Sequence, residues 1–272
     1  MRLSVIIVNW NTSALLNECI RSIEKFPPDC EHEIIVVDNA SDDFGGAAFR
    51  ERFPNAVLIA NSKNAGYARG NNQGIERASG DYVLMLNPDT EVTDGALRHL
   101  VEFMDTHPDA AAAGAKLVRP DGSIDRSVRG FPYPGPIAWE FLGLAKLFPR
   151  SRRFGAYRMT YFTYNEVAEV DQLMGSCLIL RKSTINEIGL MDEQFPIFFN
   201  EVDWLYRAKQ KGWKVHFTPG AVVVHHGAAG TRQAGRRKMK RESHDSLLRF
   251  YRKHFKDQLL TIACIRISRA FR

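Results

Sequence analysis

The chain has 272 residues, of which 44% are hydrophobic, and a formal net charge of +6. This length suits one large α/β domain with an appendage, and we expect no membrane-spanning helix because no run of eighteen apolar residues occurs. The four cysteines lack metal-ligand spacing, and the first apolar stretch is interrupted by Ser4 and Asn9. We therefore expect a cytoplasmic protein that begins with a strand rather than a signal peptide.

The charge is unevenly distributed along the chain. Residues 231–272 contain 13 of the 37 Lys/Arg and only 3 of the 31 Asp/Glu, so residues 1–230 are net acidic. An acidic body disfavours nucleic-acid binding, and a basic C-terminal segment favours contact with a polyanionic surface.

Strand and helix patterns alternate through the first part of the chain. A helix beginning at Thr12 or Ser13 follows the first apolar run, and the remaining elements alternate in the same way. The predicted strands are 3–8, 33–37, 56–60 and 82–86, and the later predicted helices are 44–53 and 66–78. This β-α order predicts a parallel, doubly wound sheet with right-handed crossovers.

The second part of the chain is less regular. Residues 119–169 carry several prolines and one amphipathic helix near 137–148, which is typical of a functional lid or a disordered segment. The other predicted strands are 110–118, 170–181, 214–218 and 221–225, and the other predicted helices are 93–105, 201–211 and a basic one from Thr231.

Four polar clusters follow predicted strands, at residues 9–11, 38–39, 64–74 and 87–89. The carboxyl ends of parallel strands meet at one edge of a sheet, so we expect the clusters to converge. Asp89 offers the hard oxygen that Mg²⁺ or Mn²⁺ prefers, and such a metal usually also holds substrate phosphates. Taken alone, an Asp after Pro is more often a turn residue. Four converging clusters favour a nucleotide-diphosphate site.

Two of these clusters allow both a binding and a structural interpretation. Asp38 could accept the imide N–H of uracil or thymine, or it could start a turn. The glycines between Asn64 and Gly74 let backbone at a helix start approach phosphate, or let the helix pack tightly on the sheet. Their spacing is not G-x-G-x-x-G, which disfavours a nicotinamide enzyme.

Acidic side chains lie among aromatic ones in residues 191–204. A carboxylate walled by aromatic rings has a raised pKa and suits general-base chemistry. Glu201 and Asp203 could equally be first-turn acids that favour the helix dipole. His225 and His226 end a strand with their rings on opposite faces, so at most one is expected to meet a metal.

Together these motifs resemble family 2 glycosyltransferases with the GT-A fold, in particular the bacterial rhamnosyltransferase-like branch. The resemblance runs from about residue 3 to 230. It is carried by Ser4-Val5-Ile6-Ile7-Val8-Asn9-Trp10-Asn11, Val36-Val37-Asp38-Asn39-Ala40-Ser41, residues 64–74, Leu86-Asn87-Pro88-Asp89, Gly175-Ser176-Cys177, Asp192-Glu193, Phe198-Phe199 and Val224-His225-His226-Gly227.

The resemblance implies an α/β fold of GT-A type, with a Rossmann-like, mostly parallel central sheet flanked by helices and a C-terminal helical basic extension. The catalytic domain would be residues 1–230, with a nucleotide-sugar-binding half (1–118) and an acceptor half (119–230). Residues 231–272 would form the basic tail.

The implied activity is inverting transfer from a nucleotide-diphosphate sugar to an acceptor hydroxyl, with Mg²⁺ or Mn²⁺ as cofactor. Rhamnose from dTDP-rhamnose is the first expectation for the donor. The acceptor would be a saccharide or lipid-linked saccharide in cell-surface polysaccharide or glycolipid synthesis.

The resemblance also assigns residues. Glu201 matches the catalytic base, with Asn200 in place of the first acid of the family's pair. Asp89 would hold the metal with help from His225, and Asn87 replaces the first acid of D-x-D, which leaves the metal one carboxylate short. The implied substrate-binding residues are Val8, Asn9, Trp10, Asp38, Asn64, Gly66, Asn71, Asn87, Gly175, Asp192 and Asp203.

Two alternatives remain open. A nucleotidyltransferase would carry a Gly-rich, Arg/Lys-bearing loop after the first strand, where this chain has Asn9-Trp10-Asn11-Thr12. A non-catalytic membrane-surface module would explain the tail but not the four clusters. The tail itself could lie on the anionic inner face of the cell membrane, as in a peripheral protein, or pack on the body.

Overall fold

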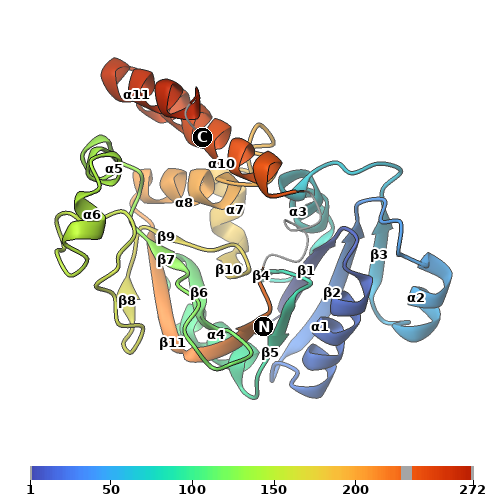
Figure 1. Ribbon diagram of the computed structural model, residues 1–272. Helices are drawn as coiled ribbons and strands as arrows, with labels where there is room; N and C mark the ends of the chain where they lie inside the picture. The colour runs from blue at the N-terminus through green and yellow to red at the C-terminus, as the bar shows by residue number, and fades with distance from the viewer. Residues whose placement is uncertain (1, 228–234, 271–272) are drawn as a thin grey trace.

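Figure 1 shows the computed structural model, which describes residues 2–227 and 235–270. A nine-stranded sheet with strand order β3-β2-β1-β4-β10-β6-β11-β5 forms its centre, and β8 pairs with β11. Its strands are β1 (Arg2–Asn9), β2 (Glu31–Asp38), β3 (Val57–Ala60), β4 (Tyr82–Leu86), β5 (Thr90–Val92), β6 (Ala110–Val118), β8 (Ala168–Glu169), β10 (Cys177–Arg181) and β11 (Lys214–His225).

The first four strands confirm the predicted parallel order. β1 pairs in parallel with β2 and β4, and β2 pairs in parallel with β3. The register places Asn9 beside Asp38. Two of the predicted polar clusters therefore start from adjacent positions at the carboxyl edge of the sheet.

The later strands depart from the expected pattern. β10 lies between β4 and β6 and is antiparallel to both. It enters the sheet after a long excursion rather than through a βαβ crossover, so the rule for parallel connections does not apply to it. The two short strands expected near the C-terminus are one strand, β11, with a register shift between Thr218 and Val222 around Pro219. Proline lacks the N–H that an uninterrupted ladder needs.

Helices cover both faces of the sheet and bury two separate cores. Leu3, Val5 and Ile7 of β1 point to one core, and Ile6 and Val8 point to the other, as strand alternation requires. The first core is covered by α1 (Ser13–Lys25), α2 (Gly46–Arg52) and α4 (Ala96–Thr106). The second is covered by α3 (Tyr67–Arg77), α7 (Lys182–Ile188), α8 (Asn200–Gln210), α10 (Arg236–His254) and α11 (Leu259–Ala270).

Helix α3 lies unusually close to the sheet. A Cβ atom built on Gly70 would lie 2.7 Å from a methyl group of Val8, and one on Gly74 would lie closer still to Ile6. Both distances are too short for van der Waals contact. Gly70 and Gly74 therefore serve tight helix–sheet packing, which is the structural interpretation of this glycine-rich block.

The segment 119–169 is ordered rather than disordered. It contains β7 (Val128–Arg129), α5 (Pro134–Phe141), α6 (Leu144–Leu147) and β8, and β7 pairs with β9 (Gln172–Leu173). Phe131 and Tyr164 are each 2% exposed, and the N–H of Val128 donates to the Tyr164 hydroxyl at 3.0 Å. The single helix expected here is divided at Gly143, where φ is +73°.

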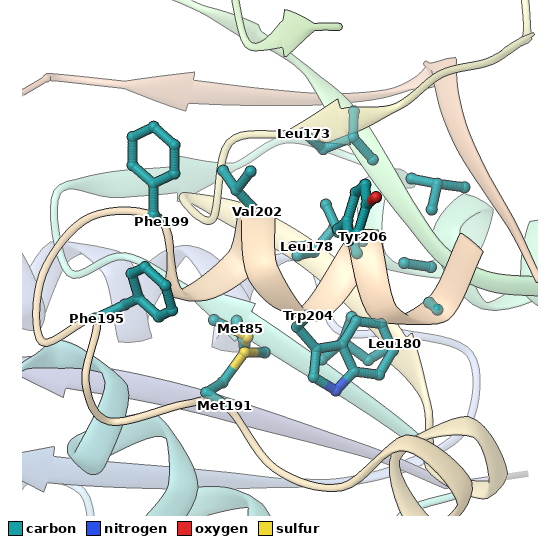
Figure 2. Close-up of a cluster of buried hydrophobic side chains, with 14 of the residues drawn as sticks. Met85, Leu173, Leu178, Leu180, Met191, Phe195, Phe199, Val202, Trp204 and Tyr206 are labelled. Atoms are coloured by element: carbon teal, nitrogen blue, oxygen red, sulfur yellow. The ribbon is translucent and has the colours of Figure 1, made fainter. Parts of the chain in front are cut away.

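Helix α10 packs on α8 as part of the second core. The Phe250 ring lies 5.4 Å from Tyr206 and 5.8 Å from Phe199, and Phe250 and Tyr251 are fully buried. Figure 2 shows α8 contributing to this core from both sides, with Val202 and Tyr206 on one and Trp204 on the other. Most apolar side chains of α10 are thus withdrawn from any external surface. Within 2–227 and 235–270, every helix is too short or too polar to cross a bilayer.

Candidate active site

A cavity of about 1100 Å³ opens at the carboxyl ends of β1 and β4. This volume is slightly above the range of about 300–1,000 Å³ that is usual for small-molecule sites. The cavity brings together nine residues expected from the sequence: Val8, Trp10, Asn64, Gly66, Asn87, Asp89, Gly175, Glu201 and His225. Asn39 also lines the cavity, so all four predicted polar clusters contribute to it.

Glu201 occupies the first turn of α8 on the cavity wall. The helix begins after Phe199, whose φ of +69° is rare for a side chain of this size and fixes the direction of the turn. Burial raises the pKa of Glu201 to about 7, although the N–H groups of Glu201 and Val202 and the charge of Arg129 act in the opposite direction. A carboxylate with this pKa can accept a proton from a substrate hydroxyl near neutral pH.

Asn200 lies directly beside Glu201 but faces the protein interior. It is fully buried, and its Nδ2 donates to the carbonyl of Ile197 at 2.9 Å. Its Oδ1 accepts no hydrogen bond from the described residues. An aspartate here would place an unpaired negative charge in the interior beside Glu201, whereas asparagine is neutral.

Asp89 and His225 meet because β5 pairs with the end of β11. The register places His225 opposite Thr90, and the N–H of His226 donates to the Asp89 carbonyl at 2.9 Å. His225 Nε2 lies 3.5 Å from Asp89 Oδ1, and its Nδ1 lies 2.8 Å from Asp125 Oδ2. Burial alone would lower the pKa of His225, but hydrogen bonds and charges from Asp125 and Asp89 raise it to about 9.

Asp89 and His225 together offer two ligands to a divalent cation once His225 gives up the proton that Asp89 and Asp125 stabilise. Residues 2–227 and 235–270 contain no group of three His, Cys, Asp or Glu side chains placed to hold a metal. Mg²⁺ sites commonly use one or two protein ligands together with substrate phosphates. A carboxylate on the far nitrogen of a ligating histidine fixes the ring and its tautomer, which is the position of Asp125.

Asn87 is held by the protein on both sides of its amide. The Tyr67 hydroxyl lies 2.9 Å from Asn87 Oδ1 and 3.0 Å from the Gly175 carbonyl, and Asn87 Nδ2 donates to Ser176 at 3.1 Å. Asn87 lines the cavity, but its oxygen is engaged by Tyr67. In this arrangement Asn87 connects β4 to the turn before β10 and does not replace the missing carboxylate.

Asn9 and Asp38 lie behind the cavity wall rather than on it. The Asp38 carboxylate accepts hydrogen bonds from Asn9 Nδ2 at 2.8 Å and from the N–H and hydroxyl of Ser41 at 3.1 and 2.6 Å. Asp38 is 4% exposed. These bonds shape the turn after β2, while Val8, Trp10 and the unpredicted Asn39 line the cavity.

Several N–H groups at the start of α3 already bind other parts of the protein, which favours the structural interpretation of this block. The Pro196 carbonyl accepts the N–H groups of Tyr67 and Ala68 at 2.7 and 3.2 Å, and Asn64 Oδ1 accepts the N–H of Gly66 at 2.9 Å. The protein itself therefore satisfies the N–H groups of Gly66, Tyr67 and Ala68 at this helix N-terminus. Asn71, also expected at the substrate, donates to the Tyr67 carbonyl within the helix and does not line the cavity.

Asp203 and Asp192 form ion pairs outside the cavity. Asp203 is fully buried and contacts Arg207 at 2.9 Å, Lys253 at 2.8 Å and His254 at 2.7 Å. Burial raises the pKa of Asp203, but hydrogen bonds from His254 and Lys253 outweigh it, and the net pKa is lowered. Lys253 also reaches Asp192 at 2.5 Å. The positions of Asp203 and Asp192 favour a role in attaching α10 to the rest of the protein over the contact with substrate that was expected for them.

Several cavity residues were not anticipated from the sequence. Arg119, Arg129 and Lys238 bring positive charge to the wall, and Asp125 and Tyr67 orient predicted residues. Arg119 follows the carboxyl end of β6, which was a usable signal. Asp125 follows no strand and belongs to no recognisable motif, so only the tertiary structure identifies it.

The comparisons with known proteins agree with this geometry. The family model for glycosyl transferase family 2 matches residues 4–178. The chain belongs to glycosyl transferase family 2. The matched range includes most of β1, the 64–74 block and Asp89, whereas Glu201 and His225 lie beyond it.

Two proteins with similar sequences are named as sugar transferases. The chain is 30% identical over 209 residues to the N-acetylglucosaminyl-diphospho-decaprenol L-rhamnosyltransferase of Mycobacterium tuberculosis, covering 73% of this chain and 67% of that protein. It is 25% identical over 215 residues to the low-salt glycan biosynthesis hexosyltransferase Agl10 of Haloferax volcanii, covering 77% of this chain and 62% of that protein.

Solved structures of glycosyltransferases share the GT-A fold. The mannosyltransferase PcManGT from Pyrobaculum calidifontis, in complex with GDP-Man and Mn²⁺, matches with a TM-score of 0.66 and 17% identity over 94% of this chain and 64% of its own. GalNAc-T7 with UDP, GalNAc and Mn²⁺ matches with a TM-score of 0.62 and 17% identity over 83% of this chain and 44% of its own. At these identities the likeness establishes the fold.

Proposed function

We propose that this family 2 glycosyltransferase transfers a sugar from a nucleoside-diphosphate sugar to a saccharide hydroxyl with inversion of configuration. The observation that carries the proposal is the position of Glu201. It is a carboxylate of raised pKa in the same cavity as the paired Asp89 and His225. The nucleotidyltransferase alternative lacks support, because the loop after β1 carries no glycine and no basic residue.

Glu201 would act as the general base of a single displacement. It would accept the proton of the acceptor hydroxyl while that oxygen attacks the anomeric carbon from the face opposite the diphosphate. The bond from carbon to the diphosphate oxygen breaks as the new glycosidic bond forms, and the diphosphate leaves as the nucleotide. No covalent intermediate is required, so the configuration inverts.

Asp89 and His225 would hold a Mg²⁺ or Mn²⁺ ion, with Asp125 orienting His225. A divalent ion there would supply charge neutralisation for the leaving diphosphate. Arg119, Arg129 and Lys238 line the same cavity and place further positive charge near a polyanionic donor. The metal-bearing complexes of similar fold, PcManGT and GalNAc-T7, support this assignment.

The relatives also indicate a donor and a process. The mycobacterial relative is named as a rhamnosyltransferase acting on a diphospho-decaprenol acceptor, which supports rhamnose from dTDP-rhamnose as the first donor to test. It also supports a lipid-linked saccharide acceptor in cell-surface polysaccharide synthesis. Val8 and Trp10 would contact the base, and Asn64, Gly66 and Gly175 would contact the rest of the donor.

A donor screen tests the proposal directly. We expect one dTDP- or UDP-sugar, with Mn²⁺, to raise the melting temperature more than the others, because a ligand that binds the folded state stabilises it. Transfer or slow hydrolysis of that donor should be lost in Glu201→Gln, while the stabilisation by donor persists. Full activity in Glu201→Gln would exclude Glu201 as the base.

A further inference from the structure

Exposed apolar side chains are concentrated in two segments. Eight of the nine large hydrophobic side chains that are exposed in the described part of the chain lie within 133–148 or 259–267. They include Leu142, Leu147 and Leu260, which are 68%, 69% and 85% exposed. Single exposed apolar residues are ordinary on protein surfaces, whereas a concentration of this kind marks an interaction site.

The two segments adjoin in space. The Tyr133 ring, immediately before α5, lies 5.8 Å from the ring of Phe255 at the end of α10, and α11 follows shortly after. Figure 1 shows α5 and α11 near each other at the upper edge of the molecule. We call the combined surface of residues 133–153, Arg252 and residues 256–267 the basic apolar face.

Unpaired cations surround these apolar groups. Residues 141–165 contain five Lys/Arg and no Asp/Glu. The exposed cations of the face are Lys146, Arg150, Arg152, Arg153, Arg252, Lys256 and Arg266. None of these side chains forms an ion pair with another residue in 2–227 or 235–270. Arg252, Lys256 and Arg266 also line a groove of about 400 Å³ together with Leu259.

We propose that the basic apolar face docks on a bilayer containing anionic phospholipids. Leucine and phenylalanine side chains would enter the boundary between headgroups and acyl chains, and the arginines and lysines would contact lipid phosphates. The mixture of exposed leucines with cations that have no acidic partner in the described part of the chain favours this occupant, because an anionic bilayer supplies both an apolar boundary and negative charge. The buried apolar residues of α10 take no part in this contact.

The docking would also orient the cavity. Lys238 and Met239 in the first turns of α10 line the cavity, and α10 leads directly into α11. A bilayer against α11 and α6 would bring a lipid-linked saccharide to the side of the molecule on which α10 borders the cavity. This last step rests on the proposed function, whereas the docking itself does not.

Vesicle sedimentation of the full chain tests the docking. Wild type should bind vesicles that contain about one third phosphatidylglycerol and should not bind pure phosphatidylcholine. The apolar variant Leu142→Gln, Leu147→Gln, Leu259→Gln, Leu260→Gln should bind at least tenfold more weakly. The charge variant Arg150→Gln, Arg152→Gln, Arg153→Gln should bind roughly 100-fold more weakly, because each cation near an anionic bilayer contributes about a fivefold factor.

Matched controls separate the face from the rest of the surface. Val167 is 50% exposed but lies outside the face, so Val167→Gln should bind like wild type. Arg50→Gln, Lys63→Gln, Arg77→Gln removes three exposed charges elsewhere and should weaken binding several-fold less than the charge variant. Unchanged melting temperatures would show that all variants fold.

Three outcomes would overturn the docking. The first is failure of wild type to bind anionic vesicles. The second is equal binding by the charge variant and by the control variant that removes three charges elsewhere. The third is the formation of concentration-dependent dimers in sedimentation velocity, if the apolar variant abolishes these dimers while its vesicle binding stays intact. Transfer to a water-soluble saccharide acceptor is measured separately in solution. Retained transfer without vesicle binding would refute the docking alone, and vesicle binding without transfer to any acceptor would refute the proposed function alone.

Discussion

His225 Nε2 stands 3.5 Å from the Asp89 carboxylate, with His225 Nδ1 bonded to Asp125 on its other side. Asp89 follows β4, and His225 ends β11, on the far side of β10 and β6 in the sheet. The short strand β5 bridges this separation, because it begins directly after Asp89 and pairs with the end of β11. The proposed metal site therefore depends on a strand of only three residues.

The first prediction concerns this pair. Asp89→Asn should abolish the extra stabilisation that Mn²⁺ gives to the nucleotide-bound protein, because a neutral amide replaces the single carboxylate ligand. The measurement is the melting temperature with nucleotide, with and without Mn²⁺. Glu91→Gln is the matched control, since Glu91 contacts His226 at 2.6 Å in the neighbouring pair. The metal assignment fails if both variants lose the effect of Mn²⁺ equally, or if neither does.

The second prediction concerns the pH dependence of transfer. Burial raises the pKa of Glu201 to about 7, and only its ionised form can accept a proton. The value of kcat/KM should therefore fall tenfold per pH unit below about pH 7 and level off above it. Glu201→Gln should lower kcat by at least 100-fold. An acidic limb centred near 4.5 would contradict the role of burial.

The third prediction concerns stability at the same residue. A carboxyl group whose pKa is raised on folding binds more protons in the folded than in the unfolded state between about pH 4.3 and 7. Its contribution to the free energy of unfolding therefore declines as pH rises through that window. Glu201→Gln removes this decline, so the variant should gain stability relative to wild type between pH 5 and pH 8. A urea denaturation series at the two pH values checks the sign.

The fourth prediction concerns the attachment of α10. Asp203→Asn should lower the free energy of unfolding by about 3–5 kcal/mol, because it leaves Arg207 and His254 around a buried site without a counter-charge and leaves Lys253 with Asp192 alone. The Asp192 side chain is 19% exposed and, of these cations, contacts only Lys253. Asp192→Asn should therefore lower the free energy of unfolding by about 1 kcal/mol or less. Equal effects in urea denaturation would contradict the central role of Asp203.

The stabilising charge of Asp203 is lost in acid. Because its pKa is lowered on folding, the contribution of Asp203 to the free energy of unfolding is complete above the unfolded pKa of about 4 and disappears as pH falls through the lower folded value.

Deleting residues from 235 onward would uncover Tyr206 and Asp203 and should prevent stable folding. Such a truncation therefore cannot serve as a test of membrane binding.

The fifth prediction concerns helix α3. Gly74→Ala should destabilise the protein by about 1–3 kcal/mol through overpacking against Ile6, although alanine is the better helix former. Gly45→Ala is the control, because its new Cβ would meet only the Cβ of Ala48 at 3.8 Å. Melting temperatures of the two variants decide the point, and a neutral Gly74→Ala would contradict the close packing.

Local patterns determined the first half of the fold and much of the cavity. Continuous apolar runs separated by helical segments are sufficient to specify β1 to β4, since parallel strands joined by helices can pack in few ways. The same rule placed residues 9–11, 38–39, 64–74 and 87–89 at one edge. The prediction that Glu201 has a raised pKa among apolar neighbours also followed from its surroundings in the sequence.

The tertiary structure decided which of those residues face the cavity and which partners they have. Asp38 and Asn9 turn toward Ser41, and Pro196 occupies the donors at the start of α3. These outcomes depend on hydrogen bonds between segments that no local pattern relates. The antiparallel position of β10 and the burial of α10 also depend on such contacts. From the sequence alone, the basic and apolar residues of α10 were as compatible with a membrane surface as with packing on the body.

The sequence by itself thus determined the class of fold and the edge of the sheet that carries the candidate site, because short-range periodicity encodes both. Only the tertiary structure decided that Asp125 holds the His225 ring beside Asp89 and that α10 belongs to the core, because both depend on contacts between residues far apart in the chain.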